Sequence, residues 1–295
     1  MSSNYKKPKQ PWLLRRTVAI NPRDANLHNV SLSHPAYHQL HTSARIAQIF
    51  PGQDICTHYS CMYVRTLVYI EHQNTVQLEL RKMLPDLVNP KLCHEFYFVH
   101  RLDYPTSGIM CIALNKKAAR AASFAFENQK VQKFYLALVH GHIREPHVII
   151  NKPIGDDIRE KNGNHKMCTN DSVFCEKPRN SYTVLMVLEH GFWKNKPATK
   201  ILLAPGTGRR HQLRVHCHYI GHTVIGDYTY SDGKDIQPHR TYLHSLRLIL
   251  NCDIENIDVR TIDPFNASIL SDYKVKNIIK IFDENIFHNI NKLMK

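Results

Sequence analysis

Apolar residues recur along this chain with two different spacings from residue 75 onward. Short apolar runs bounded by Gly, Pro or polar residues predict strands, and apolar residues three or four positions apart predict helices. The predicted strands cover residues 96–99, 109–114, 134–139, 148–150, 182–188, 200–204, 242–250 and 257–262. The predicted helices cover residues 75–83 and 116–129, with a short one that opens at 206–208 and runs through 217. Strands of varied spacing with interspersed helices indicate an α+β fold with a mixed sheet.

The last part of the chain has a helical spacing of its own. Asp272 is a suitable N-cap, and apolar residues then recur three or four positions apart. They are Val275, Ile279, Phe282, Ile286, Ile290 and Leu293. This spacing predicts an amphipathic C-terminal helix over residues 271–295, docked on a domain that spans residues 74–270.

Residues 1–73 lack a sustained period. The stretch 27–63 is rich in His, Ser, Pro and Tyr, which predicts a loop or a weakly ordered segment. Residues 62–70 are a candidate strand within this region. The chain start is basic, with no acidic residue before Asp24. We therefore expect residues 1–73 to form an atypical N-terminal segment.

Composition limits the class of protein. A hydrophobic content of 43% and a charged content of 22% are those of an ordinary globular protein. No apolar run approaches the length that spans a bilayer. The net charge of +14 at pH 7 favours a polyanionic partner, which is RNA, DNA or an anionic membrane surface.

The eight cysteines bear on the compartment. The chain is long and shows no secretory signal, and Cys111 falls inside an apolar run, so reduced thiols in an intracellular protein are expected. The cytoplasm or nucleus is the expected location, with mitochondria as the alternative because the chain start is basic. No C-x-x-C pair is present, which argues against a structural zinc site.

A forced turn carries the first candidate for chemistry. The stretch His100-Arg101-Leu102-Asp103-Tyr104-Pro105-Thr106-Ser107-Gly108 joins two apolar runs, and Pro105 and Gly108 break the chain between them. Asp103 is therefore expected at the mouth of a sheet, where a scaffold holds a side chain rigidly. The alternative is that Asp103 only closes the turn through its own backbone.

A histidine cluster is the second candidate. His211, His216, His218 and His222 lie close in sequence, and the last two would share a face of a helix. A metal-dependent hydrolase is the corresponding hypothesis. No acidic or cysteine ligand lies at a useful spacing, so RNA contact or packing is the favoured role and no metal is expected.

Three segments in order carry a family resemblance. They are the turn quoted above, Lys133-Phe134-Tyr135-Leu136-Ala137-Leu138-Val139, and a stretch from Thr207-Gly208-Arg209-Arg210-His211-Gln212-Leu213-Arg214 to Gly226-Asp227-Tyr228. The chain resembles the RluA-type RNA pseudouridine synthases from about residue 75 to about residue 265. Within them, it is similar to the animal group called RNA pseudouridylate synthase domain-containing proteins.

The resemblance implies a fold and an activity. The fold is the α+β pseudouridine synthase fold, a long bent mixed sheet with flanking helices and a central catalytic cleft. The activity is the isomerisation of uridine to pseudouridine in tRNA, rRNA or mRNA, which requires neither a cofactor nor a metal. A monomer without membrane association is expected.

The resemblance also implies residue roles. Asp103 is the catalytic carboxylate, Arg214 pairs with it, and Tyr135 stacks on the target base and is placed to take the proton from C5. Arg101 fills the gap left by a flipped nucleotide. The remaining residues expected to contact RNA are Thr106, Arg209, Arg210 and His211.

One departure from the family supports an alternative. Family members open with a strand of the type VVNKPAGL, and residues 1–73 contain nothing similar. Either another strand, such as residues 62–70, takes that place, or the domain is incomplete. The alternative function is a catalytically inactive RNA-binding protein that retains the fold.

Overall fold

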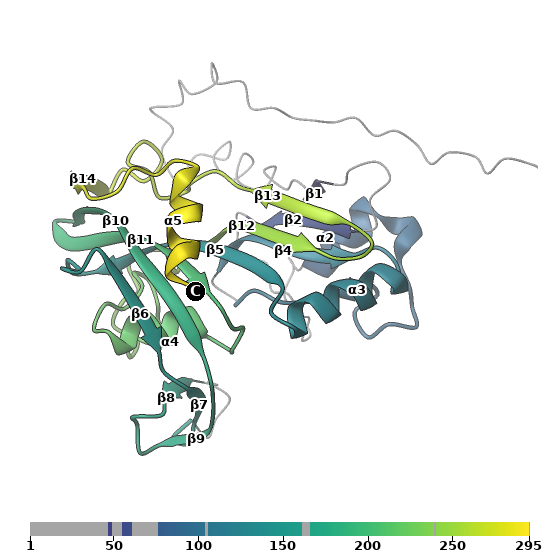
Figure 1. The fold of residues 1–295 in the computed structure, drawn as a ribbon, viewed down its shortest axis with the longest axis horizontal. Helices are drawn as coiled ribbons and strands as arrows, with labels where there is room; N and C mark the ends of the chain where they lie inside the picture. Colours follow the sequence, from purple (N-terminus) through teal and green to yellow (C-terminus); the bar gives the residue numbers. More distant parts are fainter. Residues whose placement is uncertain are drawn as a thin grey trace, which may run out of the picture.

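The computed structural model describes residues 76–103, 106–160, 166–238 and 240–294, together with the backbone of residues 47–48 and 55–60. The elements are β1 (Ala47–Gln48), β2 (Ile55–Ser60), α2 (Val76–Met83), the 3-10 helix η2 (Pro85–Leu87), β3 (Tyr97–Phe98), β4 (Ser107–Ala113), α3 (Lys116–Glu127), β5 (Val131–His140), β6 (His147–Asn151), β7 (Ile154–Asp157), β8 (Met167–Thr169), β9 (Cys175–Arg179), β10 (Tyr182–Trp193), β11 (Lys196–Pro205), α4 (Gln212–Tyr219), β12 (Leu243–Asn251), β13 (Asn256–Arg260), β14 (Tyr273–Ile278) and α5 (Asn285–Leu293) (Figure 1).

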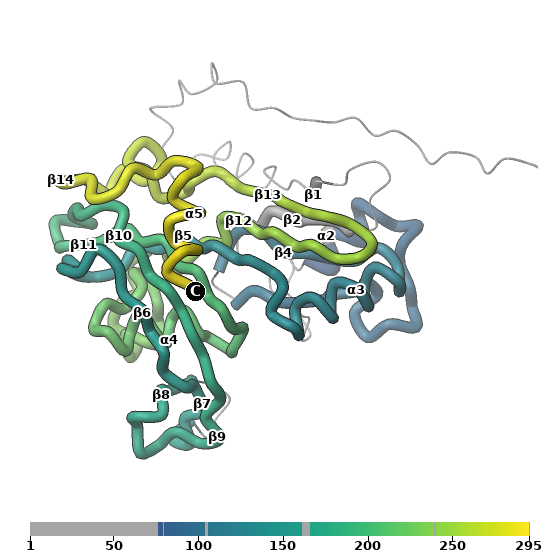
Figure 2. Tube along the Cα trace, viewed as in Figure 1, coloured from purple at the N-terminus to yellow at the C-terminus, as the bar shows by residue number. Residues whose placement is uncertain are grey.

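Within the described residues, eleven strands form one mixed sheet. Its order is β1-β2-β4-β12-β5-β11-β10-β14, with β13 on β12, β3 on β4 and β6 on β10. The pair β4–β12 is parallel and the other pairs are antiparallel. A smaller sheet, β8-β7-β9, projects from the end of the long strands (Figure 2). The large mixed sheet confirms the predicted α+β class.

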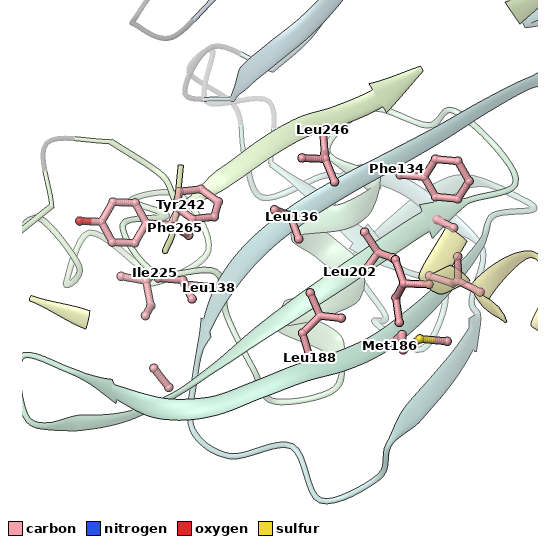
Figure 3. Packing of buried hydrophobic residues seen from close by; sticks show 14 of the residues in the cluster. Phe134, Leu136, Leu138, Met186, Leu188, Leu202, Ile225, Tyr242, Leu246 and Phe265 are labelled. Atoms are coloured by element: carbon pink, nitrogen blue, oxygen red, sulfur yellow. The ribbon is translucent and has the colours of Figure 1, made fainter. Parts of the chain in front are cut away.

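Alternation along β5 explains how the middle of the sheet is covered on both faces. Phe134, Leu136 and Leu138 point to one face, where they pack with strands β10 to β12 and with α5 (Figure 3). Ala137 and Val139 point to the other face and pack against α4. A leucine that becomes fully buried contributes about 1.5–3 kcal/mol to stability, so this alternation fixes the register of the strand.

Helix α3 covers the half of the sheet that contains β4, β12 and β13. The side chain of Asn115 accepts a hydrogen bond from the Ala118 backbone N–H at 2.9 Å and so caps the helix start. Ala118, Ala122 and Ala125 recur at helical spacing and are fully buried against the sheet. Their small side chains let the helix lie close to β4, the strand that follows the Asp103 turn.

The predicted C-terminal helix is wrong over its first half. Residues 273–278 form β14, which pairs antiparallel with the end of β10, and the helix α5 covers only Asn285–Leu293. The predicted cap, Asp272, therefore precedes a strand. The reason is the free edge of β10, whose backbone groups are satisfied by pairing with a segment that also alternates as Tyr-Lys-Val-Lys.

A segment from the N-terminal part of the chain does form a strand beside β4. β2 pairs antiparallel with β4 from Ile55↔Ala113 to Ser60↔Gly108, and β1 extends the sheet beyond it. The expectation of a loop over residues 27–63 is therefore wrong at these two strands. The alternative strand at residues 62–70 lies outside the described residues.

Candidate active site

Asp103 lies in the turn between β3 and β4. Its backbone carbonyl accepts a hydrogen bond from the Thr106 N–H at 2.9 Å, which closes the turn. Its side chain is 18% exposed, so the carboxylate can be reached from solvent. Gly108 lets the start of β4 lie very close to β12. A Cβ at this position would lie 2.1 Å from the Ser245 carbonyl oxygen. Its φ of +109° also favours glycine, so the close approach of the two strands depends on this residue.

Arg214 on α4 joins two carboxylates. Its Nε and Nη2 donate to the two carboxylate oxygens of Asp227 at 2.6 and 2.8 Å, and its Nη1 lies 3.5 Å from Asp103 Oδ2. The Asp227 side chain is fully buried and that of Arg214 is 4% exposed. Burial acts to lower the pKa of Arg214, but the hydrogen bonds and charge of Asp227 outweigh it and raise that pKa. Arg214 is therefore a fixed cation that faces Asp103.

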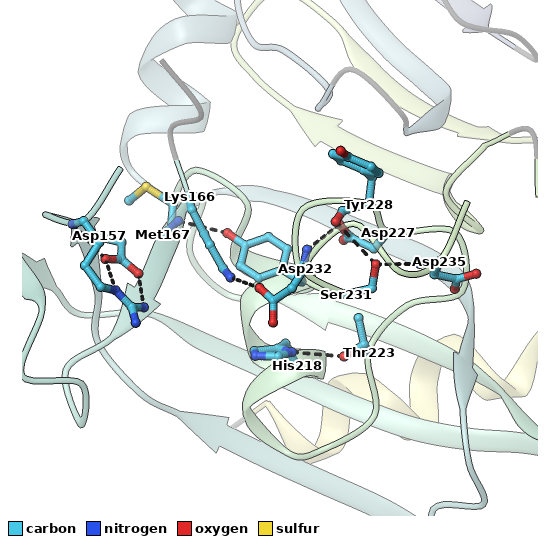
Figure 4. Close-up of polar contacts among 12 residues, drawn as sticks. Asp157, Lys166, Met167, His218, Thr223, Asp227, Tyr228, Ser231, Asp232 and Asp235 are labelled. Carbon is cyan, nitrogen blue, oxygen red and sulfur yellow. Dashed lines mark hydrogen bonds and ion pairs between the residues drawn. The ribbon is translucent and has the colours of Figure 1, made fainter. Parts of the chain in front are cut away.

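The loop after α4 holds Asp227 in place. The Ser231 N–H donates to the Asp227 carbonyl at 3.0 Å, and the Asp235 N–H donates to Ser231 Oγ at 3.0 Å (Figure 4). The Asp235 carboxylate in turn accepts from the Gly226 N–H at 2.6 Å. The position of the guanidinium thus depends on a closed loop rather than on α4 alone.

Tyr230 contacts both Asp227 and the Arg214 guanidinium. Its backbone N–H donates to Asp227 Oδ1 at 3.1 Å, and the Arg214 guanidinium carbon lies 5.1 Å from its ring centre. Its hydroxyl accepts from the Met167 N–H at 3.0 Å, which ties the site to the small sheet. Asp227 and Tyr230 were not among the predicted site residues. Asp227 could have been found as an acid that follows the apolar pair Val224-Ile225 after a single glycine, where a buried carboxylate needs a cation.

Tyr135 lies on the face of β5 that also packs against α4. Its Cα partners are Ser245 on β12 and Leu203 on β11. Its side chain packs against the cluster that includes α4 and against the cluster that includes Leu102 of the turn. Burial raises its pKa to about 12, and the charge of Asp103 acts in the same direction, against a hydrogen bond with Ser245. The phenol is therefore protonated at neutral pH and lies within electrostatic reach of Asp103.

The loop that enters α4 is held by one amide. Gln212 Nε2 donates to the Tyr182 carbonyl at 2.9 Å and to Thr183 Oγ1 at 3.0 Å. Its Oε1 accepts from the Thr207 hydroxyl at 2.7 Å and from the Arg209 N–H at 2.9 Å. Gln212 is buried, so all these bonds are shielded from water and fix the start of the helix.

The two arginines at this helix start point to the small sheet. Arg209 Nε donates to the Asn180 carbonyl at 3.0 Å, and Arg210 Nη1 lies 3.6 Å from Asp156 Oδ1. Both arginines are half-buried. They are thus placed along the strand ends next to the site and not beside Asp103.

His211, unlike Arg209 and Arg210 before it, is not a cation. It begins α4 in a left-handed conformation, with φ of 54°, and its Nδ1 lies 3.1 Å from the Tyr230 hydroxyl. Burial lowers its pKa to about 4, despite the opposing charge of Asp103. At neutral pH the imidazole carries no charge, so it can form hydrogen bonds but no ion pair.

The other three histidines of the predicted cluster bond to separate partners. His216 Nδ1 lies 2.8 Å from Thr183 Oγ1, and His218 Nδ1 lies 3.0 Å from Thr223 Oγ1 (Figure 4). His222 Nδ1 lies 2.8 Å from the backbone carbonyl of residue 140. Within the described residues, no three His, Cys, Asp or Glu side chains are arranged to hold a metal ion. The geometry therefore gives the hydrolase hypothesis no support.

A directed chain of hydrogen bonds holds the residue that follows the turn. Ser107 Oγ accepts from Arg240 Nη2 at 2.5 Å and lies 2.7 Å from Nδ1 of His244. His244 Nε2 lies 2.6 Å from Thr261 Oγ1. Burial holds the pKa of His244 well below its usual value, so the ring is neutral and donates through one nitrogen only. These residues, which sequence reasoning did not select, anchor the turn to β12.

Arg101 is exposed and begins the turn. The preceding His100 is fixed, because its Nε2 accepts from the Cys111 N–H at 2.7 Å and its ring stacks on Phe126 at 4.6 Å. The buried Thr106 hydroxyl has no hydrogen-bond partner among the described residues. Among the described residues of the turn, Arg101 is thus an exposed cation two positions before Asp103.

Comparison with known proteins decides the family. The family described as RNA pseudouridylate synthase matches residues 67–219, which is more than half of the chain. This chain belongs to that family. The synthase is 43% identical over 212 residues to RNA pseudouridylate synthase domain-containing protein 1 of Homo sapiens, which is 71% of this chain and 68% of the relative. It is also 33% identical over 180 residues to the dual-specificity RNA pseudouridine synthase RluA of Vibrio vulnificus, which is 60% of this chain and 66% of the relative.

Solved structures agree with the fold. The structure of human RNA pseudouridylate synthase domain-containing 1 superposes on this synthase with a TM-score of 0.72 and 37% identity, covering 82% of this chain and 93% of that one. The predicted family, the pseudouridine synthase fold and the class of enzyme are therefore confirmed. No helix among the described residues is long and apolar enough to cross a membrane.

Proposed function

We propose that this synthase isomerises uridine to pseudouridine in RNA with Asp103 as its catalytic carboxylate. The observation that carries the proposal is the approach of Arg214 Nη1 to Asp103 Oδ2 at 3.5 Å, with the guanidinium itself fixed by the buried Asp227. An opposite charge at this range restricts the rotamer of the carboxylate and orients it toward the guanidinium. The turn thus presents the Asp103 carboxylate in one fixed orientation.

The reaction needs such an anion at the sugar–base junction. The bond from C1′ to N1 breaks, a bond from C1′ to C5 forms, C5 loses its proton and N1 gains one, so no atom is lost and no redox partner is needed. Asp103 can attack the sugar or the base, stabilise charge at C1′ or deprotonate the sugar. Each of these routes requires its carboxylate to be ionised when the uridine arrives.

Tyr135 supplies a flat surface beside this anion. Its ring suits a stacked uracil, and its hydroxyl provides a polar tip at the edge of that surface. Because the pKa of this phenol is raised to about 12, it is neutral before the reaction. To accept the C5 proton the phenol must lose its own, and N1, which gains a proton in the reaction, is the group that takes it up. The hydrogen bond with Ser245 lowers the pKa of the phenol and so favours its deprotonated form.

RNA would approach along the exposed side of the turn. A uridine inside a stem reaches Asp103 only after it leaves the stack, and the exposed Arg101 is placed to occupy the gap. The net charge of +14 favours the phosphate backbone. The pairing of β2 with β4 supports the active enzyme over the inactive alternative, because a strand lies beside β4 although the family's opening motif is absent.

The test uses tritium release from RNA labelled at uridine C5, isolated from cells that lack the protein. Asp103→Asn keeps the shape of the side chain and removes its charge, so release should fall by at least about a hundredfold. Asp258→Asn is the matched control, since Asp258 is an exposed aspartate on β13 that pairs with Arg247. Activity of Asp103→Asn within a few-fold of the wild type, with both proteins folded, would refute the assignment.

A further inference from the structure

A lysine lies two residues before Tyr135 on β5. Because alternate strand residues share a face, Lys133 points to the same face as Tyr135 and Ala137, the face that packs against α4 further along the strand. Lys133 is half-buried. A cation thus lies beside the surface on which the uracil is proposed to stack.

The ammonium group lies at the loop that enters α4. Lys133 Nζ donates to the Thr207 carbonyl at 3.4 Å. A Cβ added to the exposed Gly208 would lie 3.7 Å from Nζ, so the glycine leaves this side of the ammonium uncovered. Lys133 also lies within electrostatic reach of His100, whose pKa is lowered to about 3 by burial and, to a smaller degree, by the Lys133 charge. The ammonium therefore contacts the loop that leads to Arg214 and lies near the residue that precedes the Asp103 turn.

This charge is not neutralised within the described part of the chain. Lysines 152, 166, 177, 194 and 200 each form an ion pair with a carboxylate, and Lys133 forms none. Burial lowers its pKa to about 8, with no carboxylate to raise it again. At neutral pH most of the protein still carries this cation, and a half-buried cation without a counter-ion is a costly arrangement. An anion from outside the chain would relieve that cost.

We infer that Lys133 binds a phosphodiester group of the RNA strand, next to the uridine that stacks on Tyr135. The inference rests on the proposed function, since it takes the stacked uridine as its reference point. An ammonium has three donors, of which the Thr207 carbonyl takes one and leaves two for phosphate oxygens. The competing role is internal, with Lys133 acting only as a brace for the 207–208 loop.

The probe is a short oligouridylate, because it offers a uridine at every position and no base has to leave a stem. Lys133→Met should bind it about tenfold more weakly, which corresponds to about 1.4 kcal/mol. The slope of log affinity against log salt should also fall by about one. Lys133→Arg should keep most of the affinity and the slope. Lys130→Met is the matched control, since Lys130 is exposed with its amine over the Phe124 ring, and it should change neither quantity.

A pH titration separates binding from bracing. Wild-type affinity should fall as pH rises through about 8, where the amine loses its proton, and Lys133→Arg should show no such step. His100, which lies within electrostatic reach of the amine, has a pKa of about 3 and does not titrate in this range. These two measurements decide the question even where Lys133→Met does not fold.

Two results would overturn the inference. One is wild-type affinity and slope in Lys133→Met. The other is a Lys133→Arg protein as weak as Lys133→Met together with a flat wild-type titration, which would show a brace. Binding needs no turnover, so a synthase that binds as expected yet forms no pseudouridine would refute the role of Asp103 and leave this phosphate site standing.

Discussion

Asp227→Ala should destabilise this synthase strongly, because it leaves the buried Arg214 without its main counter-ion. Removing one partner of a buried ion pair costs about 3–5 kcal/mol. Here two hydrogen bonds of 2.6 and 2.8 Å disappear, and the Tyr230 N–H also loses its acceptor. Asp103 remains 3.5 Å from the guanidinium and compensates in part, so we expect about 3–4 kcal/mol. Urea unfolding followed by tryptophan fluorescence measures this, since Trp193 is buried.

The chain contains a control with similar geometry and different burial. Arg247 donates to both oxygens of Asp258 at 2.8 and 2.7 Å, but Asp258 is 49% exposed. Asp258→Ala should therefore cost only about 0–1 kcal/mol. An Asp227→Ala protein no less stable than Asp258→Ala would show that burial of the pair is not what holds Arg214. The double change Arg214→Met with Asp227→Ala should cost less than the sum of the two single changes, because it removes the uncompensated charge.

Three further outcomes follow from the same contacts. Tyr135→Phe keeps the stacking face and loses the hydroxyl, so single-turnover release of C5 tritium should slow while RNA affinity stays constant; a larger loss of affinity than of rate would contradict this. Gly108→Ala places a Cβ 2.1 Å from the Ser245 carbonyl at a φ of +109°, so the soluble, cooperatively folding fraction should drop sharply, and a normal melting curve would disprove the close approach. His100 has a pKa of about 3 when folded against an ordinary 6.5, so the unfolded chain binds more protons and stability should fall as pH drops below 6.5. His100→Gln should flatten that acid limb of the stability curve, and an unchanged limb would rule out His100 as its source.

The central strands could be predicted from the sequence because each carries its own alternation. Phe134, Leu136 and Leu138 appear as one apolar set before any neighbour is known, and the structure buries them together. The residue roles came from motifs, and the structure brings the side chains of Asp103 and Arg214 to ion-pair distance. Local alternation was therefore sufficient to predict these strands, and the motifs were sufficient to predict that Asp103 and Arg214 lie close together.

The remaining features depend on contacts that no local sequence pattern reveals. Residues 273–278 satisfy a helical spacing, but the unpaired edge of β10 selects the strand β14. The neutral state of His211 follows from burial against Tyr230, which a list of basic residues does not reveal. Asp227 acts through a loop whose closure by Ser231 is not visible in the motif. In each case a tertiary contact determines the outcome, and the local propensity of the segment does not.

The position of β12 has a consequence for how the enzyme becomes active during synthesis. In the sheet, β12 lies between β4 and β5, the strands that follow Asp103 and carry Tyr135. Its residue His244 meets Ser107 across 137 positions of sequence. A nascent chain that ends before residue 243 therefore contains every motif residue but lacks the strand that sets the distance between them. Catalytic competence should thus appear only after β12 has left the ribosome, and termination before residue 243 should release a chain that carries all three motifs and no activity.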